Sequence, residues 1–174
     1  MAFSQQVKQS IHGDEYYSPQ NVVDMIVPYV NRGGYSKIWC PFDKAESKFV
    51  TTFQDLGYEV VYGHIDEGQD FFTYFEPQGD IVVSNPPFSK RDSIFERLYL
   101  WDIPFALVMN FNGLFDSRRR ARLFRQHRPE ILVPYGRMRF YHKDLGSLNQ
   151  PNFQSVYVCN KLLEDQIVFS DAQF

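Results

Sequence analysis

Residues 80–90 read DIVVSNPPFSK, so two prolines directly follow an apolar run that is typical of a buried strand. Proline cannot donate to a sheet, so the strand should end at Asn85, and Pro86 and Pro87 should fix the path of the chain beyond it. The Asn85 side-chain oxygen and a neighbouring backbone carbonyl can together accept both hydrogens of a planar amino group. Phe88 offers a ring face on which a heterocycle can stack. This arrangement suits an exocyclic amine whose lone pair is to be localised for attack on an electrophile.

Strand and helix patterns alternate along the part of the chain that must position these residues. The strand-like segments are 37–40, 58–62, 80–84 and 105–109. The helical segments begin at Ser18 and Pro19, at Asp43 with a capping-box pattern to Glu46, and at Arg91. Such alternation predicts a doubly wound, mostly parallel α/β sheet with helices on both faces. Because ligands bind at the carboxyl ends of the strands in such sheets, Asn85 should project into a ligand crevice.

The last part of the chain has a different pattern. Its strand-like segments are 131–133, 138–141, 154–159 and 167–169. The connections between them leave no room for long crossover helices, so we expect antiparallel pairing at the C-terminal edge of the sheet.

The composition indicates one domain over residues 1–174, because a chain of this length with 44% hydrophobic residues can bury one sizeable core. The start, MAFSQQVKQS, lacks the apolar core of a signal peptide, and no run approaches the roughly 18 apolar residues of a membrane span. Cys40 and Cys159 lie in apolar runs without metal-ligand spacing. We therefore expect a soluble, cytoplasmic protein without a metal site or a disulfide framework.

Positive charge is concentrated in one part of this mildly acidic chain, whose formal net charge is -3. Six arginines lie close together, namely Arg118, Arg119, Arg120, Arg122, Arg125 and Arg128. Asp116 can cap a helix through this segment, with Leu123 and Phe124 facing inward. Farther along, Arg137 and Arg139 would share one face of a strand. The pattern predicts a local polyanion-binding face, and a merely solvated helix face stays open as the alternative.

Three motifs resemble those of a known enzyme family. Asn-Pro-Pro-Phe after a buried strand resembles the catalytic motif of the S-adenosylmethionine-dependent amino-methyltransferases, especially the adenine-N6 methyltransferases. The segment IWCPFDKAESKFV, residues 38–50, resembles the first cofactor-binding motif in small phage-type members. DEYYSP, residues 14–19, is similar to the N-terminal element, and the order of the motifs matches the gamma type. The resemblance implies a class I methyltransferase fold and S-adenosylmethionine as the cofactor.

The resemblance also implies which residues surround the cofactor. Those that close over it are Tyr17, Ser18 and Pro19. Those that line its methionine end are Cys40, Pro41, Phe42 and Asp43. Those that lie near its adenine ring are Asp70 and Phe71. The candidates for holding the ribose hydroxyls are His64 and Asp66, of which Asp66 is favoured.

The expected substrate is adenine in nucleic acid, with DNA favoured. An adenine inside a duplex cannot reach Asn85, so the base must be flipped out or the enzyme must act on single strands. The arginines expected to meet phosphates are Arg118, Arg119, Arg122, Arg125, Arg137 and Arg139. The chain after the catalytic motif has no room for a separate target-recognition domain. Sequence specificity should therefore be low, very short, or supplied by a partner or by a second copy of the chain.

Two alternatives remain open. The same motif could act on a glutamine side-chain amide in a protein, since that group is also planar, but the arginines count against this substrate. A catalytically silent descendant could instead bind nucleic acid or a host protein. This second alternative rests on Cys40, Lys44 and Glu46, which stand where the common first motif has an acidic residue and glycines. Cofactor binding would separate the silent descendant from the two enzymes.

Overall fold

The structure is a computed structural model that describes residues 16–142, 148–149 and 153–174. Asp14 and Glu15 of the N-terminal motif lie outside the described residues. A seven-stranded sheet has the order β10-β6-β9-β5-β4-β2-β3, and a three-stranded sheet has the order β1-β7-β8. The strands are β1 (Tyr16–Tyr17), β2 (Lys37–Cys40), β3 (Glu59–Tyr62), β4 (Ile81–Ser84), β5 (Phe105–Asn110), β6 (Glu130–Tyr135), β7 (Phe140–His142), β8 (Leu148–Asn149), β9 (Ser155–Asn160) and β10 (Ile167–Gln173).

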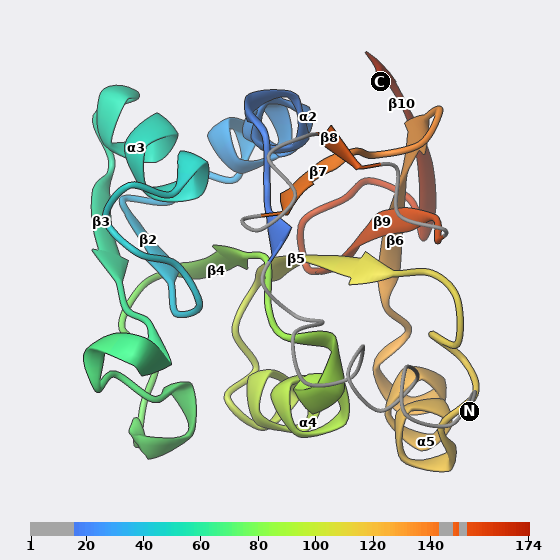
Figure 1. Cartoon of the computed structure of the whole chain (residues 1–174). Coiled ribbons are helices and arrows are strands. Elements are labelled where there is room, and N and C mark those ends of the chain that lie inside the picture. The colour runs from blue at the N-terminus through green and yellow to red at the C-terminus, as the bar shows by residue number, and fades with distance from the viewer. Residues whose placement is uncertain (1–15, 143–147, 150–152) are drawn as a thin grey trace, which may run out of the picture.

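Helices cover both faces of the large sheet, as Figure 1 shows. The α-helices are α2 (Gln20–Arg32), α3 (Lys48–Asp55), α4 (Arg91–Leu100) and α5 (Arg118–His127), and the 3-10 turns are η1 (Ile65–Glu67), η2 (Phe71–Thr73) and η3 (Phe88–Lys90). On one face α2 and α3 pack on strand residues such as Ile38, and on the other α4 and α5 pack on residues such as Trp39. Neighbouring strand residues thus enter opposite cores, as the pleat requires. The predicted α/β sheet with helices on both faces is confirmed.

Direction along the large sheet is mixed. β3, β2, β4 and β5 are parallel, whereas β9 pairs antiparallel with both β5 and β6. This agrees with the antiparallel pairing expected of the C-terminal segments. Two segments differ from that expectation, because β10 runs parallel to β6 and β7 belongs to the small sheet. The short link from β9 to β10 crosses the start of β6, where the Glu130 carboxylate accepts hydrogen bonds from the amides of Lys161, Leu162 and Leu163.

The helix starts differ from the predicted caps in three places. Ser18 makes no cap for α2, whose N-cap is Pro19. The N-cap of α3 is Ser47, whose hydroxyl accepts from the Phe49 amide, so this helix starts later than predicted. The N-cap of α5 is Ser117 instead of Asp116. In α3 and α5 the capping side chain lies one to four residues after the predicted one, and α2 has no side-chain cap. None of the helices in the described ranges is long and apolar enough to cross a membrane.

Candidate active site

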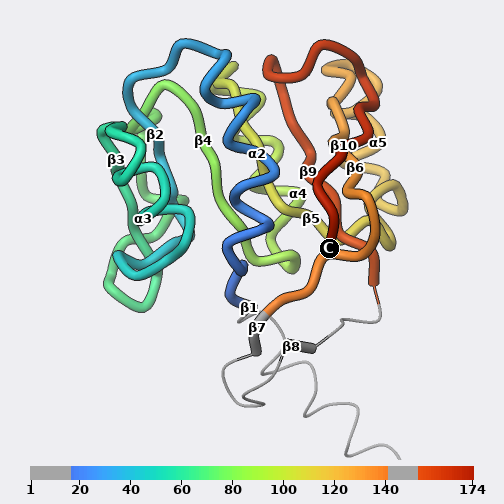
Figure 2. Tube along the Cα trace, turned by 90° about the horizontal axis from the view of Figure 1, so that it is seen from above, coloured from blue at the N-terminus to red at the C-terminus, as the bar shows by residue number. Residues whose placement is uncertain are grey.

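A cavity of about 1110 Å³ lies at the carboxyl ends of β2, β3 and β4. The strand order reverses here, because β3 lies on one side of β2 and β4 on the other. Crevices at such reversals are where open α/β sheets bind ligands. Figure 2 shows β1 and β7 beyond this end of the sheet. Tyr17 at the end of β1 and Arg139 just before β7 both line the cavity.

Most of the residues predicted from sequence are brought together around this cavity. They are Tyr17, Ser18, Pro19, Pro41, Phe42, Asp43, His64, Asp66, Asp70, Phe71, Asn85, Pro87 and Arg139. Cys40 differs from the prediction, because its side chain is fully buried in the core beneath α2 and α3 and does not line the cavity. Pro86 is buried and does not line the cavity. Phe88 turns away and meets Phe153 edge-on, with 5.9 Å between ring centroids.

The Asn85 side chain is held in a defined orientation. Its Nδ2 donates to the Ser18 hydroxyl at 3.2 Å, and its backbone N–H donates to the Asp43 carboxylate. With Nδ2 turned to Ser18, Oδ1 is the acceptor end of the amide. The residue is half-buried at the cavity wall, directly after β4. The bond to Ser18 therefore fixes the orientation of the amide at the cavity wall.

Asp43 joins the predicted cofactor motif to the predicted catalytic motif. Its carboxylate is buried and accepts hydrogen bonds from the Ser47 hydroxyl at 2.6 Å and from the Ser84 hydroxyl. Burial raises the pKa of Asp43 to about 6, although the bonds from Ser47, Ser84 and the Asn85 amide act in the opposite direction. Sequence reasoning missed this contact. Its signal was Ser84, the one hydroxyl in the apolar strand that leads to Asn85.

Aromatic rings form one wall of the cavity. Phe42 and Phe71 lie 4.9 Å apart between ring centroids, and Trp39 packs behind Phe71 at 5.6 Å. Asp70 holds the turn that carries Phe71, since its carboxylate accepts from the Phe72 amide at 2.9 Å. The wall therefore presents a fixed apolar surface beside an acidic side chain. Sequence reasoning did not identify Trp39 as its support.

Charged side chains gather near the end of β3. The Asp66 carboxylate lies 2.8 Å from the Lys44 ammonium and 3.3 Å from Nδ1 of His64. Nδ1 of His64 also accepts from the Asp66 amide, so the His64 side chain is the N-cap of η1. Both candidates for holding a ribose therefore lie at the cavity. Among the described residues, no group of three or more His, Cys, Asp or Glu side chains could hold a metal ion.

The arginines do not form one surface around the cavity. Arg137 and Arg139 are exposed on either side of buried Met138, but all three precede β7, so the strand predicted to carry them does not include them. In α5, Arg120 is buried and paired with Asp92. The exposed arginines of this helix are Arg118, Arg119, Arg122 and Arg125, of which Arg119 pairs with Glu96.

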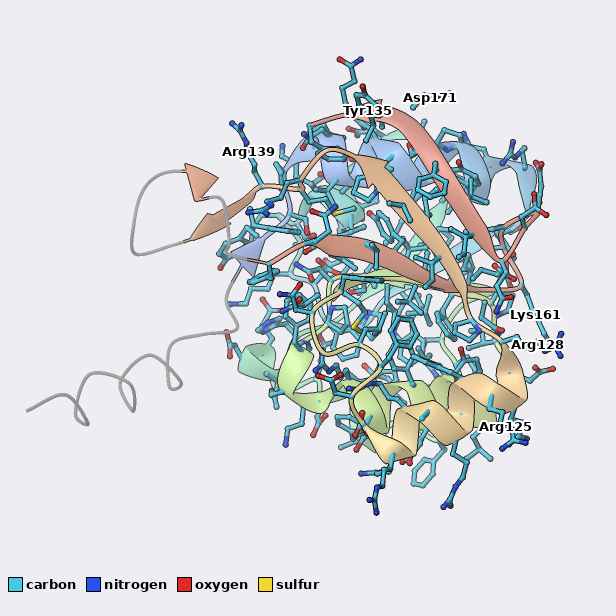
Figure 3. All side chains as sticks on the ribbon, turned by 90° about the vertical axis from the view of Figure 1, so that its right-hand side faces the viewer. Arg125, Arg128, Tyr135, Arg139, Lys161 and Asp171 are labelled. Atoms are coloured by element: carbon cyan, nitrogen blue, oxygen red, sulfur yellow. The ribbon has the colours of Figure 1, made fainter. Side chains whose placement is uncertain are left out.

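The two ends of α5 lie at opposite ends of the strands, one at the carboxyl ends and the other at the amino ends of β5 and β6. The helix begins after β5 ends and leads to the start of β6, which runs parallel to β5. Its end therefore lies at the amino ends of the parallel strands, away from Asn85. Figure 3 accordingly shows Arg125 and Arg128 far from Arg139. The phosphate-binding role of these side chains stays a prediction.

Comparison with solved structures reveals similar folds. The chain resembles a modification subunit of a proposed type I restriction enzyme from Vibrio vulnificus, with a TM-score of 0.55 and 13% identity over 90% of this chain and 47% of that one. It also resembles a dimethyladenosine transferase from Plasmodium falciparum, with a TM-score of 0.50 and 13% identity over 87% of this chain and 65% of that one. The chain thus spans about half to two thirds of these proteins. No family model and no curated protein matches it. The protein has the α/β fold of class I methyltransferases.

Proposed function

We propose that this protein transfers a methyl group from S-adenosylmethionine to the N6 amino group of adenine in nucleic acid, with DNA as the favoured substrate. The observation that carries the proposal is the position of Asn85, whose amide is oriented by Ser18 at the wall of a cavity that residues of the first motif also line. The two similar structures support it, because one is a modification subunit and the other a dimethyladenosine transferase.

The cavity residues fit the proposed cofactor. Ligand pockets usually measure about 300 to 1000 Å³, so a cavity of about 1110 Å³ has room for a nucleoside-sized cofactor and part of an acceptor. Phe42 and Phe71 offer an apolar wall for its adenine, and Asp66 or His64 can hold its ribose. Ser47 and Lys48, which begin α3, also line the cavity and can meet its carboxylate. When bound, the cofactor supplies a methyl group whose bond to sulfur breaks as the bond to N6 forms.

The chain's own residues prepare the amine. Oδ1 of Asn85 accepts one amino hydrogen, and a backbone carbonyl fixed by the prolines accepts the other. Accepting both hydrogens draws the nitrogen toward tetrahedral geometry and localises its lone pair. Asp43 keeps the backbone of Asn85 in place through the amide N–H. The extra proton on nitrogen leaves to water after transfer, so no strong base is required.

The test is incubation of the protein with methyl-labelled cofactor and separate DNA, RNA and protein acceptors. We expect label on N6 of adenine. Asn85→Ala removes one of the two acceptors and should lower turnover by roughly two to three orders of magnitude, as for loss of one preorganised polar contact. Asn85→Asp should keep part of the activity, because a carboxylate can still accept.

The control is cofactor binding by calorimetry, which Asn85→Ala should leave nearly unchanged. Equal methyl transfer by the wild type and Asn85→Ala would overturn the catalytic assignment. Label on a glutamine amide would favour the protein-substrate alternative. A wild type that binds no cofactor would favour the silent descendant.

A further inference from the structure

Two phenylalanines are exposed beside the candidate site, outside the cavity. Phe111 directly follows β5 and is 42% exposed, and Phe115 is 52% exposed. Their rings meet edge-on with 5.9 Å between centroids. Single exposed apolar residues are common, but a pair at the ligand-binding edge of an α/β sheet suggests a surface that a ligand covers.

A second pair of rings lies at the loop that carries the proposed catalytic motif. Phe88 follows the two prolines and meets Phe153 edge-on at 5.9 Å. The chain at Phe153 lies beside Phe111, because the Phe111 amide donates to the backbone oxygen of Gln154 at 2.7 Å. The segments that carry the two ring pairs therefore lie side by side at the carboxyl end of β5.

The loop that carries the exposed pair is held rigidly. The backbone oxygen of Gly113 accepts from Nη2 of Arg120 at 2.7 Å and from Nη2 of Arg91 at 3.1 Å. Nε of Arg120 donates to the backbone oxygen of Leu114 at 2.8 Å, and the same guanidinium pairs with Asp92. Arg120 is 4% exposed, so a buried charge is used to fix a surface loop. The exposed rings are thus presented in a set position, which lowers the entropy cost of binding.

Positive charge accompanies the two ring pairs. Arg118 is exposed just after the loop, and Lys90 is exposed in the turn after Phe88. Rings that stack on bases, beside cations that meet phosphates, are the means by which proteins bind unpaired nucleic acid. A closed duplex hides the faces of its bases and offers nothing for these rings to stack on.

We propose that Phe111 and Phe115 stack on the bases that flank the target adenine, so that the preferred ligand is an unpaired strand. The inference rests on the proposed function, since it extends the acceptor side of the same site. It assigns a role to two residues that no motif identifies. Double-stranded DNA would then be a ligand only where it is locally opened.

The experiment measures binding of a fluorescent adenine-containing oligonucleotide, single-stranded or duplex, without cofactor. The wild type should bind the single strand at least tenfold more tightly than the duplex. Phe111→Ala with Phe115→Ala should weaken single-strand binding about tenfold or more, because each stacked base contributes strongly to affinity. Phe111→Trp with Phe115→Trp should retain it. Phe75→Ala, which removes a 97% exposed ring far along the chain, is the matched control and should bind normally.

A probe with abasic positions around the adenine makes the test specific to stacking. The wild type should bind this probe as weakly as the double alanine variant binds the intact strand, and the variant should lose little more. The inference is overturned if the double alanine variant binds normally, if the wild type prefers duplex, or if the variants change only the oligomeric state.

The outcome is independent of the catalytic test. Loss of methyl transfer in Asn85→Ala together with normal single-strand binding by the double alanine variant would overturn this inference alone. Unchanged methyl transfer in Asn85→Ala together with weakened single-strand binding by the double alanine variant would overturn the proposed catalysis alone.

Discussion

Single residues link the two parts of the candidate site. Asp43 belongs by sequence to the first motif, yet its carboxylate contacts Ser84 and the amide of Asn85. The sequence predicted that Asn85 would project into a ligand crevice and that Asp43 would line the cofactor, and both residues line the cavity. It could not predict their contact, because more than forty positions separate them and only the folded sheet brings β2 and β4 together. Ser18 is a similar case, since its hydroxyl serves Asn85 instead of capping a helix.

The buried carboxyl group should make stability depend on pH. Burial raises the pKa of Asp43 from 3.8 to about 6, so the folded protein binds this proton more tightly than the unfolded chain does. The resulting stabilisation is complete below about pH 4 and is lost as pH rises through 6, which amounts to on the order of 3 kcal/mol. In Asp43→Asn this dependence should disappear. Urea unfolding between pH 4 and 8 measures the difference between the two proteins.

The substitution also removes hydrogen bonds, which affects how the pH dependence is interpreted. Asparagine cannot accept from the hydroxyls of Ser47 and Ser84 and from the Asn85 amide as a carboxylate does, so Asp43→Asn will also change stability by an amount that does not vary with pH. Only the slope is diagnostic. Parallel pH profiles for the two proteins would contradict the raised pKa.

At the scale of elements, local patterns predicted what local interactions decide. The strand Lys37–Cys40 has the predicted bounds, and the helix Arg91–Leu100 has the predicted start, because local apolar spacing indicates them. The predicted start of α3 was wrong. Asp43 and Ser47 are both good N-cap residues, but Asp43 is buried and Ser47 caps the helix. The position of β9 between β5 and β6 depends on long-range pairing, which no local pattern encodes.

From the direction of α5 we predict which of its arginines contribute to DNA binding. Arg118 lies at the end near the candidate site, whereas Arg125 and Arg128 lie toward the opposite edge of the sheet. Replacing Arg118 and Arg137 with Gln should lower DNA affinity about equally for all sequences and flatten the log-log salt slope by about 0.7 to 0.9 per lost contact. Replacing Arg125 and Arg128 with Gln removes the same charge and should leave the slope unchanged. Fluorescence titrations at several salt concentrations measure both.

This comparison also separates the two interpretations of the basic segment. A solvated helix face predicts a wild-type salt slope near zero. A uniform basic surface predicts equal effects of the two double substitutions. Only a loss confined to Arg118 and Arg137 agrees with nucleic acid bound at the carboxyl edge.

At the scale of the whole molecule, the cavity is assembled from nearly the full described length. Its walls include Tyr17 before α2, the segments after β2, β3 and β4, Arg139 and Phe174. The pairing of β1 with β7 brings Tyr17 close to Arg139. A sequence motif can indicate which residues bind a ligand, but this closure depends on contacts between distant segments. A ligand in the cavity therefore touches elements that would separate on unfolding.

Cofactor binding should accordingly stabilise the whole protein. At a free S-adenosylmethionine concentration 100 times Kd, binding to the folded state alone adds about 2.7 kcal/mol. For a chain of this size, that shift raises Tm by roughly 5 to 10 °C. Asp66→Asn removes one carboxylate at the cavity and should reduce the shift if Asp66 holds the ribose, whereas His64→Ala should reduce it if His64 does. Asp165→Asn, a matched change at an exposed position away from the cavity, should leave the shift intact. Thermal unfolding followed by circular dichroism at several cofactor concentrations measures the Tm of all four proteins. A wild-type Tm that does not change with cofactor concentration would contradict the proposed cofactor site.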